Sequence, residues 1–236
     1  MPKISLVVAD VETTGTSIVD HDIIEISCKR LLDGEQKTWW MKAIHEDTIS
    51  AEALAVNGHK LEDITWKTKA GKEKYRLPED VLPEIENWLF DDRVTTADRI
   101  LCGHNIAFDF DRMQECWKRC GNIETFPFSI NTIDTKMLAV FFDFLQNTSG
   151  RTYSLSHVIK RLGITKRHAH TADQDVMMTF DLVQYYINYF GDFIKNSKQP
   201  LPIIGENTYE VEPELEQEDN EEVEDEQVDE LEDLDI

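Results

Sequence analysis

The amino-acid sequence predicts an α/β domain built on one mixed, five-stranded sheet flanked by helices. Three strand-like segments with short connections open the chain, and helical segments then alternate with two further strands. This order of elements is typical of domains in which strands and helices share one core. Hydrophobic residues make up 41% of the 236 residues, which is enough to fill such a core.

The first strand is expected to begin near Leu6, because five of the six residues over 6–11 are apolar. A continuous apolar run suits a central strand that is covered on both faces. Asp10 and Glu12 lie near its end, and the alternation of side chains along a strand places both on one face. A turn containing Gly15 follows.

Two more strands are expected close behind the first. Residues 23–32 form the second strand, and the pair Asp33-Gly34 is a hairpin signal that leads into the third, over residues 36–43. Glu25 falls inside the second strand. It either supports a metal site or faces solvent, and we slightly favour solvent.

Helical periodicity and capping residues predict the later elements. A short helix ends at Gly58, and a polar segment over residues 59–76 carries six Lys or Arg residues. That segment is either a loop that contacts a phosphate backbone or an ordinary solvated insertion. The expected helices cover residues 49–57, 79–90, about 106–117, 135–145, 154–162 and about 172–190, and the two later strands cover 99–103 and 130–133.

The formal net charge of −23 is concentrated at the C-terminus. Residues 206–236 contain 17 acidic residues and no Lys or Arg, which leaves 30 acidic and 24 basic side chains in the first 205 residues. We therefore expect a folded domain over residues 1–195, a linker over 196–205 and a disordered acidic tail over 206–236. The tail is a solubilising segment, a docking peptide for a basic protein partner, or a nucleic-acid mimic that competes for the domain's own cleft.

The sequence gives no indication of a membrane protein. It contains no run of 18 apolar residues, so we expect no transmembrane helix and no membrane partner. The N-terminus lacks a signal-peptide pattern, and the four cysteines do not complete a zinc pattern. We therefore expect a cytoplasmic protein with reduced thiols.

Two helix starts carry further acidic side chains. In Gly-His-Asn-Ile-Ala-Phe-Asp, residues 103–109, Asn105 is a good helix N-cap and Asp109 lies about one turn inside the helix. Before the last helix, Thr171 and Gln174 fit a capping box, which gives Asp175 nearly the same position. His170 precedes that cap. Because neighbouring carboxylates repel each other unless a cation lies between them, these acidic residues together indicate a site for divalent cations such as magnesium.

With these motifs the chain resembles the DEDDh group of 3′–5′ exonucleases, which includes polymerase proofreading subunits and RNA-trimming enzymes. The resemblance covers about residues 4–189. The sister group has a tyrosine four residues before the last aspartate, where this chain has Thr171, so the histidine type is indicated. The matching residues are Asp10 and Glu12 in DVETTG, Asp109 in HNIAFD, and His170 and Asp175 in HTADQD.

The resemblance implies an RNase H-like fold, in which the first three strands are antiparallel and the two later strands lie beside the first. It implies that two Mg²⁺ ions, for which Mn²⁺ can substitute, are held by Asp10, Glu12, Asp109 and Asp175, with His170 as the general base. The implied activity is hydrolysis of phosphodiester bonds from a nucleic acid 3′ end, in proofreading or repair, with single-stranded DNA favoured over RNA. The alternatives are an RNA-trimming exoribonuclease or oligoribonuclease, and a non-catalytic module that recruits a polymerase.

Several other residues are expected to contact the substrate. The backbone of the turn after the first strand would approach the terminal nucleotide, and Asn105 would either cap its helix or hold a phosphate. Four basic residues before the last helix would grip the strand being cut, or else form a solvated turn; they are Lys160, Arg161, Lys166 and Arg167. The expected substrate-binding residues are Thr13, Thr14, Gly15, Asn105, Lys166 and Arg167.

Overall fold

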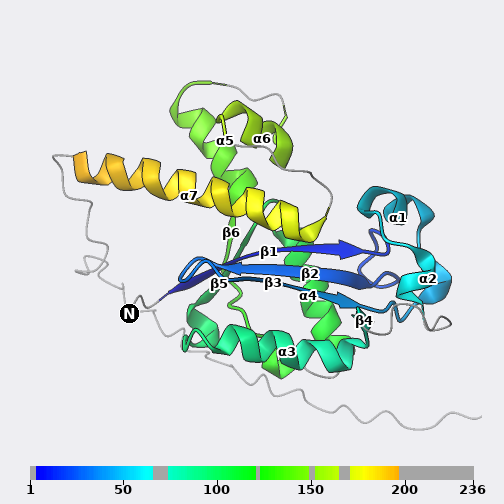
Figure 1. Ribbon diagram of the computed structural model, residues 1–236. Coiled ribbons are helices and arrows are strands. Elements are labelled where there is room, and N and C mark those ends of the chain that lie inside the picture. Colours follow the sequence, from blue (N-terminus) through cyan, green and yellow to red (C-terminus); the bar gives the residue numbers. More distant parts are fainter. Residues whose placement is uncertain (1–3, 66–73, 121–122, 149–151, 165–170, 197–236) are drawn as a thin grey trace, which may run out of the picture. The chain divides into compact units, whose positions relative to one another are not determined.

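Helices cover both faces of one mixed sheet (Figure 1). The computed structural model describes residues 4–65, 74–120, 123–148, 152–164 and 171–196. The strand order is β4-β3-β2-β1-β5-β6. Antiparallel pairing joins β1 (Ser5–Thr13), β2 (Ile23–Arg30) and β3 (Gln36–Met41), whereas β4 (Tyr75–Arg76), β5 (Arg99–Gly103) and β6 (Thr132–Asp134) each run parallel to a neighbour.

The predicted mixed α/β sheet is confirmed, but it has six strands rather than five. The additional strand is β4, which pairs Tyr75 with Trp40 at the sheet edge. It lies in the segment that we predicted to be a polar loop or insertion. Two residues are too few to produce a strand periodicity, so no local pattern predicts β4. Tyr75 is buried where the strand pairs with the sheet.

The two faces of β1 are buried against different helices, as its apolar run predicts. Val7, Ala9 and Val11 contribute to a core with α3 (Pro78–Phe90) and α4 (Ala107–Arg119). On the opposite face, Val8 packs with residues of α7 (Ala172–Asn196). Figure 1 shows α7 on one side of the sheet and α3 and α4 on the other.

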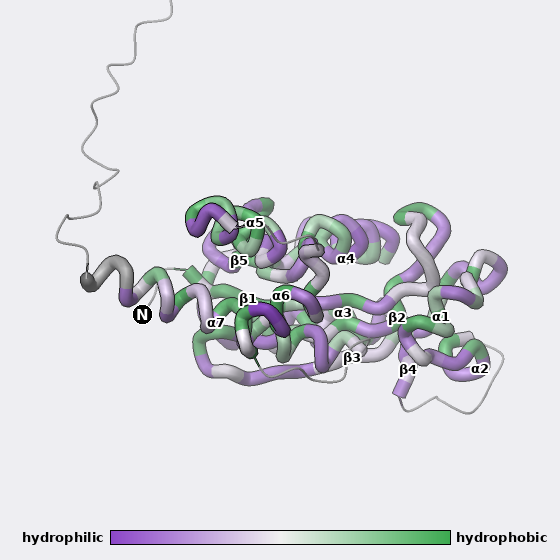
Figure 2. The backbone as a smooth tube through the Cα atoms, turned by 90° about the horizontal axis from the view of Figure 1, so that it is seen from above, coloured by the Kyte–Doolittle hydropathy of each residue, from purple (hydrophilic) through white to green (hydrophobic). Residues whose placement is uncertain are grey.

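The remaining helices extend these two layers. Ser50 caps α1 (Ala51–Asn57) by accepting a hydrogen bond from the backbone of Ala53, and Gly58 ends the helix with φ of 75°, as predicted. α5 (Thr135–Leu145) and α6 (Leu155–Arg161) pack against α7 through an apolar cluster. The helices alternate hydrophobic and hydrophilic residues along their length (Figure 2). The short elements are α2 (Leu61–Ile64) and the 3₁₀ turns η1 (Glu46–Thr48), η2 (Thr96–Asp98) and η3 (Ile123–Thr125).

The last helix is longer than predicted, because α7 continues to Asn196. The first residue of the predicted linker is therefore helical. Residues 197–205 of that linker and the predicted tail over 206–236 lie outside the described residues. In the described part of the chain, the helices are too short or too polar for one of them to cross a bilayer.

A buried ion pair fixes the start of β5. The Arg99 and Asp92 side chains are both 0% exposed, and two hydrogen bonds of 2.9 and 2.6 Å join the guanidinium to the carboxylate. Arg99 also donates to the backbone carbonyl of Pro127. This arrangement satisfies a charge that burial alone would make very unfavourable.

Replacement of Asp92 by Asn should therefore destabilise the protein strongly. The change leaves the buried guanidinium without its counter-charge, so we expect the free energy of unfolding to fall by about 3–5 kcal/mol, measured by urea denaturation. The neighbouring Asp91 is exposed, and Asp91→Asn serves as the matched control, with an expected change within about 0.5 kcal/mol. Equal stabilities for the two variants would contradict the assignment.

Candidate active site

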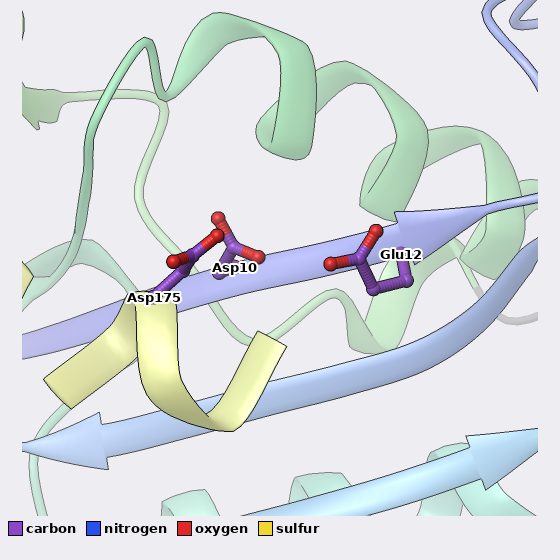
Figure 3. Close-up of side chains that lie close together, drawn as sticks. All are labelled: Asp10, Glu12 and Asp175. Carbon is purple, nitrogen blue, oxygen red and sulfur yellow. The ribbon is translucent and has the colours of Figure 1, made fainter. Parts of the chain in front are cut away.

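Three carboxylates converge above the sheet. Asp10 and Glu12 project from the same face of β1, and Asp175 reaches them from the first turn of α7 (Figure 3). One oxygen from each carboxylate lies within 4.8 Å of the other two. The three side chains are half-buried. Residues that are far apart in the sequence thus form one compact group of oxygen donors.

The convergence is electrostatically unfavourable without a counter-charge. Burial, and then the charges of Asp109 and Asp175, raise the pKa of Asp10 well above its usual range. Burial, and then the charges of Asp175 and Glu25, raise the pKa of Glu12 to about 8. A divalent cation would relieve this repulsion, and hard carboxylate oxygens are the donors that Mg²⁺ and Mn²⁺ prefer. The residues therefore fit a divalent metal site.

Asp109 lies beside this group and also holds the backbone. Asp109 is 5% exposed, and its carboxylate accepts a hydrogen bond of 3.0 Å from the N–H of Val11, which ties α4 to β1. Burial raises the pKa of Asp109 to about 7, although the bond from Val11 opposes that rise. In the described part of the chain, Asp109 is not within the 4.8 Å group. Its role as a metal ligand stays a prediction.

The prediction that Asn105 caps α4 is wrong. Asn105 has a left-handed backbone with φ of 71°, and the capping position belongs to Ile106, which makes no side-chain cap. Asn105 takes this conformation because its N–H donates to Asp134 and its side-chain oxygen accepts from the Lys136 ammonium, at 3.0 and 3.2 Å. Asn tolerates left-handed backbone better than most residues. A contact between Asn105 and phosphate stays a prediction.

The turn after β1 is fixed by its own hydrogen bonds. The Thr13 hydroxyl donates to the carbonyl of Gly15, and the Thr14 hydroxyl accepts from the N–H of Asp22. Gly15 packs against the ring of His21 so closely that a Cβ at position 15 would lie 2.5 Å from ring atoms. Packing against His21 therefore explains why position 15 is glycine. Contact of this turn with a nucleotide stays a prediction.

The start of α7 lies where the sequence places it. The carbonyl of Thr171 accepts hydrogen bonds from the N–H groups of Gln174 and Asp175, so the helix begins at Ala172. His170, Lys166 and Arg167 precede this turn and lie outside the described residues. Their predicted roles are therefore not tested by the geometry.

Sequence reasoning missed two side chains that hold this site in place. The buried Asn57 amide donates to the carbonyl of Thr13 at 3.0 Å, and its hydrogen bond to Glu12 opposes the rise in pKa that burial causes. Gln36 of β3 donates to the carbonyl of Asp173 at 3.0 Å and ties α7 to the sheet.

Our preference for a solvent-facing Glu25 is wrong. Glu25 is 4% exposed and lies directly opposite Glu12 on the neighbouring strand. Its carboxylate accepts a hydrogen bond from the Trp40 indole and lies 3.0 Å from a ring nitrogen of His59. The one local signal was the run of isoleucines around Glu25, which indicates a strand buried on both faces.

Comparison with known proteins gives a consistent family match. The family model described as Exonuclease, RNase_T, matches residues 7–183. The DNA polymerase III PolC-type of Latilactobacillus sakei is 28% identical over 175 residues, which cover 73% of this chain and 10% of that protein. The 3′-5′ exonuclease DinG of Staphylococcus saprophyticus is 23% identical over 208 residues, which cover 88% of this chain and 21% of that protein. The chain thus spans about a tenth to a fifth of the length of these relatives.

Solved structures with the same fold include two exonuclease I proteins. That of E. coli, in complex with a dT13 oligonucleotide, is 16% identical with a TM-score of 0.62, covering 81% of this chain and 43% of that one. That of Methylocaldum szegediense is 20% identical with a TM-score of 0.60 and the same coverage. At this identity the similarity concerns the fold, and it confirms the RNase H-like exonuclease fold that was predicted.

The raised pKa values predict how stability depends on pH. The native state holds the Glu12 proton up to about pH 8, whereas the unfolded chain releases it near 4.5. In the presence of a chelator, Glu12 should therefore lower the free energy of unfolding as pH rises between these values. Burial lowers the pKa of His104 from its ordinary value of 6.5. Below pH 6.5, His104 should therefore raise the free energy of unfolding as pH rises, which opposes the effect of Glu12.

The Glu12→Gln variant isolates the effect of Glu12. We expect its melting temperature in chelator to exceed that of the wild type near pH 8 and to match it near pH 4, measured by differential scanning calorimetry. Mg²⁺ should stabilise the wild type more near pH 8 than near pH 5, because cation binding displaces protons. The assignment would be contradicted if, in chelator, the wild type became more stable relative to Glu12→Gln as the pH rose.

Proposed function

The chain belongs to the RNase_T exonuclease family, and we propose that it is a metal-dependent 3′–5′ exonuclease that releases nucleoside 5′-monophosphates from single-stranded DNA. The observation that carries the proposal is the convergence of the half-buried Asp10, Glu12 and Asp175 within 4.8 Å. Hydrolysis at phosphorus requires stabilisation of charge on the attacking and leaving oxygens. A cluster of carboxylates that needs cations meets that requirement.

The four acidic residues share one task in this proposal. Asp10, Glu12 and Asp175 would hold Mg²⁺, or Mn²⁺ in its place, and Asp109 would complete the set beside Asp10. When bound, the cations supply Lewis-acid stabilisation and lower the pKa of the attacking water. The chain supplies rigid positions, because Gln36 fixes the start of α7 and Asn57 fixes the end of β1.

His170 is proposed as the general base. An imidazole with a pKa near 6.5 can accept a proton from the attacking water at neutral pH. His170 directly precedes Thr171, whose carbonyl fixes the turn that carries Asp175. The support for this role is the spacing of His170, Ala172 and Asp175 in the third motif.

The preference for DNA rests on the relatives. Two of them are named as a DNA polymerase and as a 3′-5′ exonuclease, and exonuclease I was solved with a dT13 oligonucleotide. A role in proofreading or repair in the cytoplasm follows by analogy. Recruitment of a basic protein partner is proposed from the charge of the acidic tail. RNA trimming is the second candidate, because the same site can cleave either backbone.

A degradation assay with metal and with chelator tests the activity. Full-length protein and Mg²⁺ should shorten 5′-labelled single-stranded DNA progressively from its 3′ end, faster than RNA of the same sequence, and chelator should stop the reaction. Asp10→Asn should lower turnover by about 10³-fold or more, because it removes a central charge from the cluster. Its melting temperature in chelator should not fall. Retained turnover in Asp10→Asn would disprove the role of Asp10, and equal rates on RNA would favour the second candidate.

A pair of neighbouring histidines tests the general base. We expect His170→Ala to lower kcat by about 10²–10⁴-fold, because an aligned proton acceptor is lost. Mn²⁺ binding, measured by calorimetry, should change little. His168 lies two residues earlier and does not fit the motif spacing, so His168→Ala is the matched control and should keep kcat within about twofold. A larger loss in His168→Ala would show that the wrong histidine had been assigned.

A further inference from the structure

The Glu25 carboxylate lies beside the group formed by Asp10, Glu12 and Asp175 but does not belong to it. Glu25 on β2 stands directly opposite Glu12 on β1. Side chains at opposite positions project from the same face with Cβ atoms about 4.5–5.5 Å apart, which is close enough for two carboxylates to bind one cation. Among the described residues, however, the carboxylate oxygens that gather within 4.8 Å come only from Asp10, Glu12 and Asp175.

Two ring nitrogens hold one oxygen of this carboxylate. The indole N–H of Trp40 donates to Oε2 of Glu25 at 3.0 Å, and Nε2 of His59 lies 3.0 Å from the same oxygen. The side chains of Glu25 and His59 are each 6% exposed, so these contacts are shielded from water. Trp40 belongs to β3, which lies on the far side of β2 from β1. Its hydrogen bond therefore draws the Glu25 carboxylate away from Glu12.

The His59 ring is itself held in a fixed orientation. Nδ1 of His59 lies 2.7 Å from the hydroxyl of Tyr75, which is 4% exposed on β4. The left-handed backbone of Gly58 turns the chain at the end of α1, and the N–H of His59 then donates to the side-chain oxygen of Asn57 at 3.2 Å. The ring cannot turn away from Glu25 without breaking a buried contact, so the position of Glu25 is determined by the fold.

We propose that His59 and Trp40 are positioning residues that keep Glu25 from becoming a ligand of the divalent cations. This inference rests on the proposed function and concerns the same site. Cations that activate water and stabilise a leaving oxygen need coordination positions that no side chain fills, and Mg²⁺ typically keeps several waters and binds substrate phosphates directly. An additional carboxylate would fill one of these positions and add negative charge where the phosphate has to approach. The two ring nitrogens thus keep the site open for substrate.

The His59→Leu variant tests this restraint, because it removes one donor with little change in side-chain volume. Mn²⁺ is titrated into the full-length protein without nucleic acid, and binding is measured by calorimetry below the melting temperature. We expect His59→Leu to bind Mn²⁺ about tenfold more tightly, because the released Glu25 becomes a ligand, and to lower kcat at saturating Mn²⁺ by about tenfold. Trp40→Phe removes the other donor, should act in the same direction, and replaces His59→Leu if that variant does not fold. His157 is exposed on α6, and the control His157→Leu should leave both quantities within about twofold.

A double-mutant cycle with Glu25→Gln separates the restraint from a general loss of packing. In the Glu25→Gln background, His59→Leu should change Mn²⁺ affinity by less than about twofold, because no carboxylate is left to release. Damage to the packing would instead weaken Mn²⁺ binding in both backgrounds. Unchanged or weaker binding in His59→Leu, or tighter binding that persists with Glu25→Gln, would overturn the proposal. If the wild type degrades no nucleic acid, the proposed function fails, while the Mn²⁺ titrations still decide on the role of His59.

Discussion

The structure depends on holding mutually repelling carboxylates on a buried strand. Asp10 and Glu12 share one face of β1, and Asp175 is brought to them by a helix that packs on that same face. Repulsion among buried charges opposes this arrangement, so other contacts have to maintain it. The apolar residues of β1 anchor it between two helical layers, and hydrogen bonds from Asn57 and Gln36 fix the segments on either side. The site is thus an electrostatically unfavourable arrangement that is held at the edge of an ordinary apolar core.

Local patterns in the sequence were sufficient for most of the fold. The apolar run of β1, the hairpin between β2 and β3, and the helix that ends at Gly58 all follow from residues adjacent in the chain. The elements that were missed depend on distant partners. β4 exists because Tyr75 pairs with Trp40, and Glu25 is buried because Trp40 and His59 satisfy its carboxylate. Neither partner is visible in a window of neighbouring residues.

The candidate site shows the same division between local and distant information. The sequence placed Asp175 in the first turn of its helix, because that position depends on the backbone of Thr171. It misplaced the cap of α4, because Asn105 is held by Asp134 and Lys136, which lie about thirty positions later. The supporting role of Asn57 was hidden because Asn before Gly is also a common way to end a helix. Residue types indicate the chemistry of the site, whereas its supporting contacts can be predicted only when the register of the sheet is known.

The close packing of Gly15 against His21 restricts how this turn can evolve. The imidazole occupies the space that a side chain at position 15 would need, and it accepts a hydrogen bond from the N–H of Ser17 that keeps it there. A bulkier residue at position 15 is therefore tolerated only after position 21 has become smaller. The order of mutational steps matters here, so in descendants of this chain position 15 should change only where position 21 has already changed.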